Sequence, residues 1–401
     1  MEKKVITFGC RLNACESETI RDFAAEMGLD DFTVINTCAV TEEAERKLRQ
    51  TIRKLRRENE KIKIILTGCA SELNPDYYMK MEGVVGIISN NVKLHRAEYA
   101  KYASESNAAS KSLSSQKIRG FLQIQNGCDQ KCTYCIVKLT RGPNVSLSAD
   151  EIVQRAKQLL RKGYKEIVLT GVNISAYGRD FSSKQNLASI IRHILKNVPD
   201  LGRLRLSSLD PADMDEDLLK VIKNEERLMP HFHESIQSGD DIILKRMMRR
   251  HTRQQIKEIN CKILEARPDA VLGADIIVGF PTETDEMFLN TKKMIVEASI
   301  SLLHLFPFSA RPGTSASLMP MIEKNAVKHR LKELKQLAND ILAKKLSEYK
   351  GKNIMAIAEN EYTARTNSFL QIKSTKPLII GAEYLFHCDY LRGNILIGVP
   401  H

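Results

Sequence analysis

Three cysteines lie close together in a C-x3-C-x2-C run, at Cys128, Cys132 and Cys135. The run comes directly after a predicted strand at 120–125. Three thiolates on one short loop can hold three irons of a 4Fe-4S cluster, and the fourth iron then has no ligand from the protein. A zinc site is the alternative, although structural zinc usually has a fourth protein ligand at recognisable spacing. The run therefore favours iron–sulfur chemistry, on a fold that presents a loop at the end of a strand.

Strands and helices alternate through the region that carries this run, 118–345. Short apolar runs with β-branched residues predict strands, and helical patterns such as 149–162 and 253–266 lie between them. The strand candidates are 120–125, 166–170, 203–207, 232–237, 271–278 and 302–306. Six such units predict an α/β fold, a partial (β/α)6 barrel, in which ligands gather at the C-terminal ends of the strands.

Residues 1–97 alternate in the same way and predict a small parallel α/β domain. A cysteine follows each of its strand candidates: Cys10 after 5–8, Cys38 after 33–35, and Cys69 after 62–66. Because parallel strands place their C-terminal ends along one edge, these three thiols can converge. A lone cysteine is usually only buried, and the remaining ones have that character: Cys15, Cys261 and Cys388. Three at matching strand ends instead predict a second 4Fe-4S cluster.

The rest of the chain divides into a linker and a terminal domain. Residues 98–117 are rich in Ser and Ala and predict an interdomain linker. A charged helix pattern covers 321–349. From 346 to 401 short strand patterns separated by Gly, Asn and Lys predict a small β-barrel. Its strand candidates are 353–358, 369–372, 377–380, 383–388 and 395–399.

Charge indicates the kind of partner. The formal net charge is +12, which suits a polyanion such as nucleic acid, although general solubility is the plain alternative. The densest basic stretch, 46–63, contains nine Lys and Arg against Glu58 and Glu60. On a helix this is a positive face that can bind RNA or can simply be solvated.

The expected cellular compartment depends on whether the sequence has a signal peptide or a membrane span. The N-terminus has no apolar signal-peptide core, and no stretch approaches the ~20 apolar residues of a membrane span. We therefore expect a cytoplasmic protein without a membrane partner. In a reducing compartment the nine cysteines suit metal or redox chemistry better than disulfides.

The central region resembles the radical S-adenosylmethionine (SAM) enzymes. Their hallmark is a C-x3-C-x2-C run with an aromatic residue before the third cysteine, here Tyr134, on the loop after the first barrel strand. The resemblance implies that SAM binds the open iron of this cluster. Gly171 and Asn173 stand where the superfamily has a turn that meets the SAM amino group. Residues 275–284 resemble its segment near the SAM adenine.

Two more residues become SAM-site candidates through this resemblance. Gln237 belongs to a Gln-Ser-Gly segment that is similar to one at the barrel mouth of these enzymes. Arg249 is a candidate for contacting a SAM carboxylate or an RNA phosphate, because a guanidinium pairs well with either anion. A structural ion pair is the alternative for Arg249.

Nearly the whole chain resembles the methylthiotransferase family of radical SAM enzymes. The segments around Cys10, Cys38 and Cys69 are similar to its N-terminal domain, and the terminal barrel resembles its TRAM domain. The resemblance implies two 4Fe-4S clusters. One SAM methylates a sulfur on the auxiliary cluster, and a second SAM yields a 5′-deoxyadenosyl radical that removes a hydrogen from the substrate. It also implies the tRNA anticodon arm as substrate, an electron donor such as flavodoxin or ferredoxin, and a monomeric enzyme.

The residues after Cys10 bear on the substrate. Gly9-Cys10-Arg11-Leu12-Asn13 is similar to the MtaB-type branch, which converts N6-threonylcarbamoyladenosine next to the anticodon into its 2-methylthio derivative. Residues 37–41 and 44–47 also suit that branch. Arg11 fits a substituent that ends in a carboxylate, although it can equally position the loop. The alternatives are a MiaB-type enzyme acting on isopentenyladenosine and a zinc-dependent RNA-binding protein without enzymatic activity.

Three positions depart from the family pattern. Lys138 stands where the family commonly has Pro, and Val145 where it often has Arg. Glu234 replaces a usually apolar residue and shares a strand face with Phe232 and Ile236. A carboxylate on that face should need a partner.

Overall fold

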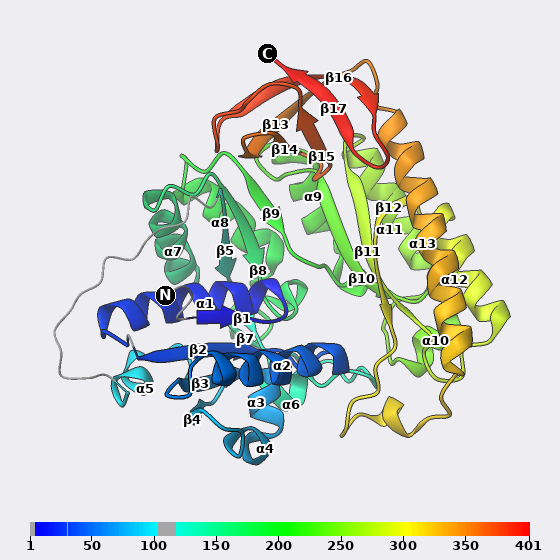
Figure 1. Ribbon diagram of the computed structural model, residues 1–401. Helices are drawn as coiled ribbons and strands as arrows, with labels where there is room; N and C mark the ends of the chain where they lie inside the picture. The colour runs from blue at the N-terminus through cyan, green and yellow to red at the C-terminus, as the bar shows by residue number, and fades with distance from the viewer. Residues whose placement is uncertain (1–4, 30, 103–117) are drawn as a thin grey trace.

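The computed structural model describes residues 5–29, 31–102 and 118–401. Figure 1 shows an N-terminal domain at the lower left, a central set of strands and helices, and a small terminal barrel at the top. Most of the expected linker, 103–117, lies outside the described residues, and its first residues belong to helix α5 (Arg96–Ala100). None of the described helices is both long and apolar enough to cross a membrane.

The N-terminal domain is a parallel sheet in the order β1-β2-β3-β4. Its strands are β1 (Val5–Thr7), β2 (Phe32–Thr37), β3 (Lys63–Gly68) and β4 (Val84–Ile88). Its helices are α1 (Arg11–Glu26), α2 (Glu42–Glu58), α3 (Cys69–Leu73) and α4 (Pro75–Met79). Strand β4 is additional to the sequence-based expectation, because Gly86 interrupts its apolar run. A side chain at Gly86 would clash, since a Cβ there would lie 2.0 Å from the Tyr102 hydroxyl.

The central region contains six parallel strands in two sheets, β5-β8-β9 and β10-β11-β12, and confirms the expected partial barrel. The strands are β5 (Arg119–Gln123), β8 (Glu166–Thr170), β9 (Leu204–Leu206), β10 (His231–Gln237), β11 (Val271–Val278) and β12 (Ile300–Pro307). A short ladder of β6 (Gln125–Asn126) and β7 (Val145–Ser146) lies beside them. An isolated bridge between Leu209 and Glu234 links the two sheets.

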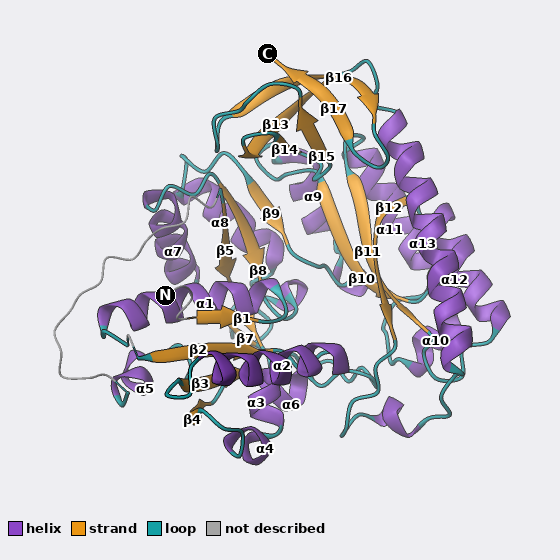
Figure 2. Ribbon diagram, in the orientation of Figure 1, coloured by secondary structure: helices purple, strands orange, loops and turns teal. Residues whose placement is uncertain are grey.

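Helices lie outside the strands, as Figure 2 shows. They are α6 (Val137–Arg141), α7 (Ala149–Arg161), α8 (Leu187–Asn197), α9 (Glu216–Asn224), α10 (Asp241–Arg246), α11 (Arg253–Ala266), α12 (Asp285–Glu297) and α13 (Lys324–Ser347). Helix α11 begins where a capping box predicts, because the Thr252 and Gln255 side chains accept from each other's backbone N–H. The apolar faces of α7, α8 and α9 pack with β5, β8 and β9 into the largest core cluster.

The terminal domain is a closed barrel in the order β13-β14-β15-β17-β16. Its strands are β13 (Asn353–Asn360), β14 (Thr363–Thr366), β15 (Gln371–Ser374), β16 (Glu383–Leu391) and β17 (Leu396–Pro400). One strand expectation was wrong. Residues 377–380 are a loop that begins with a proline, which has no N–H for a ladder, whereas 363–366 form β14 despite having only one apolar residue.

A buried carboxylate fastens the terminal barrel to the central strands. Glu166 is fully buried and forms ion pairs with Arg119, Arg203 (3.0 Å) and Arg205 (2.8 Å). Burial alone would raise the pKa of Glu166, but Arg205 and Arg119 outweigh it and lower that pKa to about 2. The same arginines reach the terminal barrel, through the Asn367 and Thr366 carbonyls and the carboxylates of Glu359 and Glu383.

Candidate metal centres

The first cysteine trio lies where β1, β2 and β3 end. Thr7 pairs with Asn36, and Thr37 pairs with Gly68, so the three strand ends lie side by side. Cys10 caps α1, Cys38 follows β2 directly, and Cys69 is the first residue of α3. The strand-end expectation from the sequence is thus met in three dimensions.

Close packing at this edge requires glycine. Gly9 has a φ of +97°, and a Cβ there would lie 2.8 Å from the Cys38 Sγ atom. Cys38 and Cys69 are buried, whereas Cys10 is exposed. Burial raises the pKa of Cys38 to about 11, and the neighbouring Cys10 and Cys69 raise it further. A bound metal centre would relieve this repulsion by holding the three sulfurs as thiolates. One buried side and one exposed side fit a centre that is anchored by three cysteines and open to substrate.

The second trio lies on the loop between β6 and α6. Gly127, just before Cys128, has a φ of +68°, and a Cβ there would lie 1.7 Å from the Pro143 carbonyl oxygen. Burial raises the pKa of Cys135 to about 12, with Cys132 and Cys128 adding to the effect. These three sulfurs therefore also form one electrostatically coupled group on a loop that only glycine can begin.

Arg249 lies against this second trio. Its Nη1 is 3.6 Å from the Cys132 Sγ atom, and its Nη2 is 3.2 Å from an oxygen of Asp210. Burial opposes the charge of Arg249, but Tyr134 and Asp210 outweigh it and raise its pKa. Tyr134 packs beside the same group, and burial followed by Cys132 raises its pKa as well. Arg249 lies beside the cysteine loop that contains Tyr134 and forms an ion pair with Asp210, a residue that no motif indicated; its contact with SAM stays a prediction.

The other SAM candidates meet the cysteine loop through Gln125. The Asn173 backbone N–H donates to the Gln125 Oε1 at 2.9 Å, and the Gln125 Nε2 donates to the Gly127 carbonyl at 2.6 Å. A Cβ on Gly171 would lie 2.8 Å from Gln125, so the turn needs its glycine. Gln237 ends β10 with a left-handed φ of 76°. Gln125 was missed from the sequence, although a polar residue that ends an apolar strand was an available signal.

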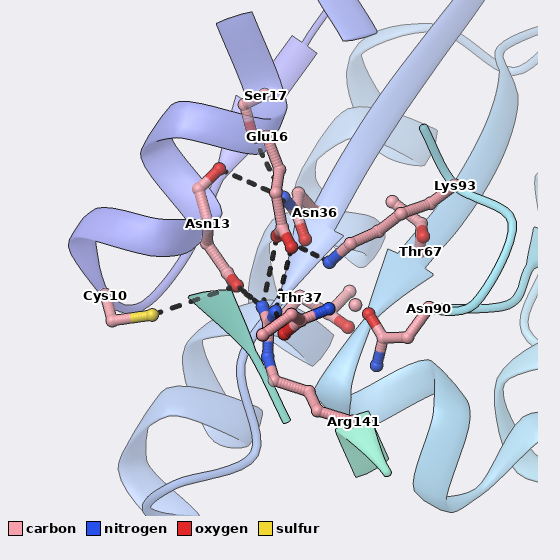
Figure 3. A network of polar contacts seen from close by, with 12 residues as sticks. Cys10, Asn13, Glu16, Ser17, Asn36, Thr37, Thr67, Asn90, Lys93 and Arg141 are labelled. Carbon is pink, nitrogen blue, oxygen red and sulfur yellow. Dashed lines mark hydrogen bonds and ion pairs between the residues drawn. The ribbon is translucent and has the colours of Figure 1, made fainter. Parts of the chain in front are cut away.

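A buried polar network joins the start of α1, which carries Cys10, to Arg141 in the helix that follows the second trio (Figure 3). Arg141, the last residue of α6, donates to Asn13 Oδ1 (2.5 Å), Glu16 Oε1 (2.8 Å) and Asn126 Oδ1 (3.0 Å). The Asn13 Nδ2 donates to the Thr37 carbonyl at 2.9 Å, which fixes the α1 start against the end of β2.

The charge of this network faces the first trio. Glu16 also pairs with Lys93, at 2.5 Å between Oε2 and Nζ, and all these groups are buried. Burial opposes the charge of Arg141, but Glu16 and then Cys69 outweigh it and raise its pKa. Sequence patterns indicated neither Arg141 nor Glu16, because residues 125 positions apart in the chain show no shared periodicity.

The three departures from the family pattern have different surroundings. Lys138 lies exposed on α6, and the Val145 side chain is exposed on β7. Glu234 is fully buried, and neither of its carboxylate oxygens has a hydrogen-bond partner among the described residues. Burial raises the pKa of Glu234 to about 8. Asn260 lies near enough to oppose this rise, but burial outweighs it, and the side chain is suited to being neutral.

The expected basic face is partly neutralised. On α2, Arg46 and Lys47 pair with Glu43, Arg49 pairs with Glu45, and Lys54 pairs with Glu58. Arg53 and Arg57 are exposed and make no ion pair with any residue that the structure describes. The free positive charge of α2 is therefore smaller than the sequence suggests.

Comparisons with known proteins agree with this geometry. Residues 122–295 match the radical SAM superfamily, and residues 3–89 match the uncharacterized protein family UPF0004. The chain is 43% identical, over 95% of its length and 93% of the relative, to the threonylcarbamoyladenosine tRNA methylthiotransferase MtaB of Rickettsia prowazekii. It is 34% identical to the tRNA-2-methylthio-N(6)-dimethylallyladenosine synthase of Bacillus subtilis, over 88% of this chain and 75% of the relative.

Solved structures show the same fold at low identity. The radical SAM methyltransferase TsrM of Kitasatospora setae has a TM-score of 0.55 and 12% identity, over 77% of this chain and 68% of that chain. This likeness concerns the fold alone.

Proposed function

Since this chain belongs to the methylthiotransferase family of radical SAM enzymes, we propose that it adds a methylthio group to carbon 2 of N6-threonylcarbamoyladenosine next to the anticodon of tRNA. One observation carries the proposal. A relative with this activity in its name is 43% identical along nearly the whole chain, and both cysteine trios lie at strand ends inside the matched regions.

Cys128, Cys132 and Cys135 would hold the cluster that binds SAM, and Cys10, Cys38 and Cys69 would hold the auxiliary cluster. When bound, the clusters supply the electron that cleaves SAM and the site that carries the sulfur to be transferred. Each trio offers three soft sulfur donors from neighbouring positions, which fits an iron–sulfur group.

The chain's own residues would bind SAM and orient it relative to the two cysteine loops. Arg249, held by Asp210, places a cation beside the trio that includes Cys132. The carboxylate of SAM would pair with this cation. Gln125 ties the turn at Gly171 and Asn173 to the cysteine loop, so SAM contacts and cluster ligands keep one geometry. Arg141 links the two cysteine loops and so fixes the separation between the radical source and the sulfur.

Partners follow from the same proposal. The anticodon arm of tRNA is the substrate, and the positive surplus of the chain favours it. We expect a small electron donor such as flavodoxin or ferredoxin, a monomeric enzyme, and activity in the cytoplasm, where the tRNA is found.

The test offers reconstituted enzyme two anticodon stem-loops under single-turnover conditions. One carries threonylcarbamoyladenosine and the other isopentenyladenosine, and nucleoside mass spectrometry reads the product. We expect methylthiolation of the first. Preferential reaction of the second would reassign the substrate to the branch of the 34% identical relative.

A second measurement tests the division of labour. The Cys10→Ala variant should still form 5′-deoxyadenosine from SAM and should lose methylthio transfer. Loss of both activities in a folded variant would contradict the assignment of Cys10 to the auxiliary cluster.

A further inference from the structure

A cavity of about 220 Å³ lies where all three parts of the chain meet. Arg11 contributes from the start of α1, His231 and His233 from β10, and His304 from β12. The terminal barrel closes it with Arg365 and Phe369. The His304 side chain is 56% exposed, so this side of the cavity faces solvent. Arg11 directly follows Cys10 in the chain, at the start of α1.

Arg11 brings a cation to this cavity. It makes no hydrogen bond and no ion pair with any residue that the structure describes. Burial and the nearby Arg119 disfavour the charge of Arg11, whereas Asp275 and Glu166 favour it without forming an ion pair with it. By contrast, Arg365 in the same wall is bound to Glu359 at 3.0 Å. A partly buried guanidinium without a partner calls for an anionic ligand.

The histidines supply hydrogen-bonding groups to this cavity. Burial lowers the pKa of His231 well below 6.5, and the ring stacks on Phe369 with centroids 4.7 Å apart. His233 Nε2 and His304 Nδ1 both lie on one oxygen of Asp275, at 3.0 and 3.3 Å. Two rings that share one carboxylate oxygen form a hydrogen-bonded set, which fixes their tautomers and leaves Nε2 of His304 available. Asp275 is engaged by these rings and forms no ion pair with Arg11 among the described residues, although its charge favours the guanidinium.

We propose that this cavity binds the threonyl end of the N6 substituent, with Arg11 pairing with its carboxylate and His304 hydrogen-bonding its polar groups. The inference rests on the proposed function and adds the subsite that selects the substrate. An isopentenyl group would leave Arg11 buried without a partner, at the cost of a desolvated charge. Arg11 is the residue next to Cys10, so this subsite shares the start of α1 with the proposed auxiliary cluster.

The experiment measures the affinity of cluster-loaded enzyme for three anticodon stem-loops. One carries threonylcarbamoyladenosine, the second carries the same group with its carboxylate converted to a neutral amide, and the third carries unmodified adenosine. We expect the acid to bind about 10- to 100-fold more tightly than the amide. Arg11→Gln should abolish this preference and leave the affinity for the unmodified loop unchanged. The surface control Lys80→Gln should change neither the preference nor the affinity.

His304→Ala provides a second variant on the opposite wall, away from the cysteines. It should weaken binding of the acid and the amide alike, with the preference for the acid retained through Arg11. Iron content should be unchanged in both variants.

Several outcomes would overturn the inference. Equal weakening of modified and unmodified loops by Arg11→Gln would make Arg11 a phosphate contact. Equal affinity of the wild-type enzyme for acid and amide would exclude the carboxylate pair, even where the acid-bearing loop is methylthiolated and the proposed function stands. If no loop were methylthiolated, the proposed function would fail, and the binding comparison would still decide the role of the cavity.

Discussion

Arg141 and Glu16 form a buried ion pair, with 2.8 Å between Nη1 and Oε1, that joins the helix after one cysteine loop to the helix that begins beside the other trio. Asn13 and Asn126 accept from the same guanidinium. Every member of this set lies within six residues of a cysteine of one trio or the other. The planar guanidinium of Arg141 has several N–H donors and can therefore bind groups near both trios at once. A lysine ammonium, which is a point charge, would not do so with the same geometry.

Replacing Arg141 with Lys should preserve the pair with Glu16 and lose the fork to Asn13 and Asn126. We expect the variant to fold and to form more 5′-deoxyadenosine per methylthio product than wild type, because the two loops are less firmly registered. Arg155→Lys, at an exposed pair on α7, is the control. An unchanged product ratio in a folded Arg141→Lys enzyme would show that the bridge has no positioning role.

Replacing Arg141 with Met removes the charge altogether. Glu16 then keeps Lys93 as its cationic partner, and breaking a buried pair costs about 3–5 kcal/mol. Chemical denaturation of the cluster-loaded protein should report a loss of that order. A loss below about 1 kcal/mol, the value of an exposed pair, would contradict the burial argument.

Iron content should divide between the trios. Reconstituted protein should hold about eight irons, four per cluster. The triple change of Cys128, Cys132 and Cys135 to Ala should remove about half of them and spare the rest. Cys261→Ala, at an exposed cysteine of α11, should remove none. Full iron retention in the triple variant, or zinc in place of iron, would reject the assignment.

Glu234 should make stability depend on pH. Its pKa is raised to about 8 by burial, against 4.5 for an ordinary glutamate. Below pH 4.5 both the folded and unfolded states hold the proton, so the group costs nothing there. Between pH 4.5 and 8 only the unfolded state releases it, and stability falls by about 1.4 kcal/mol per pH unit.

The Glu234→Leu variant removes this dependence. Its free energy of unfolding relative to wild type should therefore rise from pH 5 to pH 8, as read from urea midpoints. Glu226→Leu, at an exposed glutamate, should show a difference that does not vary with pH. A constant difference for Glu234→Leu would mean that the buried carboxyl is not protonated in the fold.

RNA binding should depend on the unpaired charges of α2. Replacing Arg53 and Arg57 with Gln should flatten the dependence of log affinity on log salt by about one unit per lost phosphate contact. Arg46→Gln and Lys54→Gln are matched controls, because Glu43 and Glu58 already neutralise those charges. Equal effects of the two pairs would indicate a general field rather than contacts on this helix.

The sequence predicted what local rules determine. Cys10, Cys38 and Cys69 converge because parallel strands end at one edge, and that follows from periodicity alone. Their roles as ligands stay predictions. Strand β14 was missed because Thr363–Thr366 contains only one apolar residue and is specified by barrel closure.

Polar contacts between residues far apart in the chain could not be predicted from such local rules. Arg141 and Glu16 meet across the domain boundary, and their burial depends on each other. Glu234 was recognised as out of place from its strand face, but whether it finds a partner depends on residues from other elements. The cavity at Arg11 is similarly invisible in the sequence, because its walls come from three parts of the chain.

The fastening at Glu166 has a thermodynamic consequence. One carboxylate in the central strands, that of Glu166, forms ion pairs with Arg119, Arg203 and Arg205. These arginines also bind groups of the terminal barrel. Separating the barrel would leave three arginines crowded around a single buried acid, so neither part keeps its stability when the other melts. The central strands and the terminal barrel should therefore behave as one cooperative unit, with a single heat-absorption peak in calorimetry rather than one for each domain.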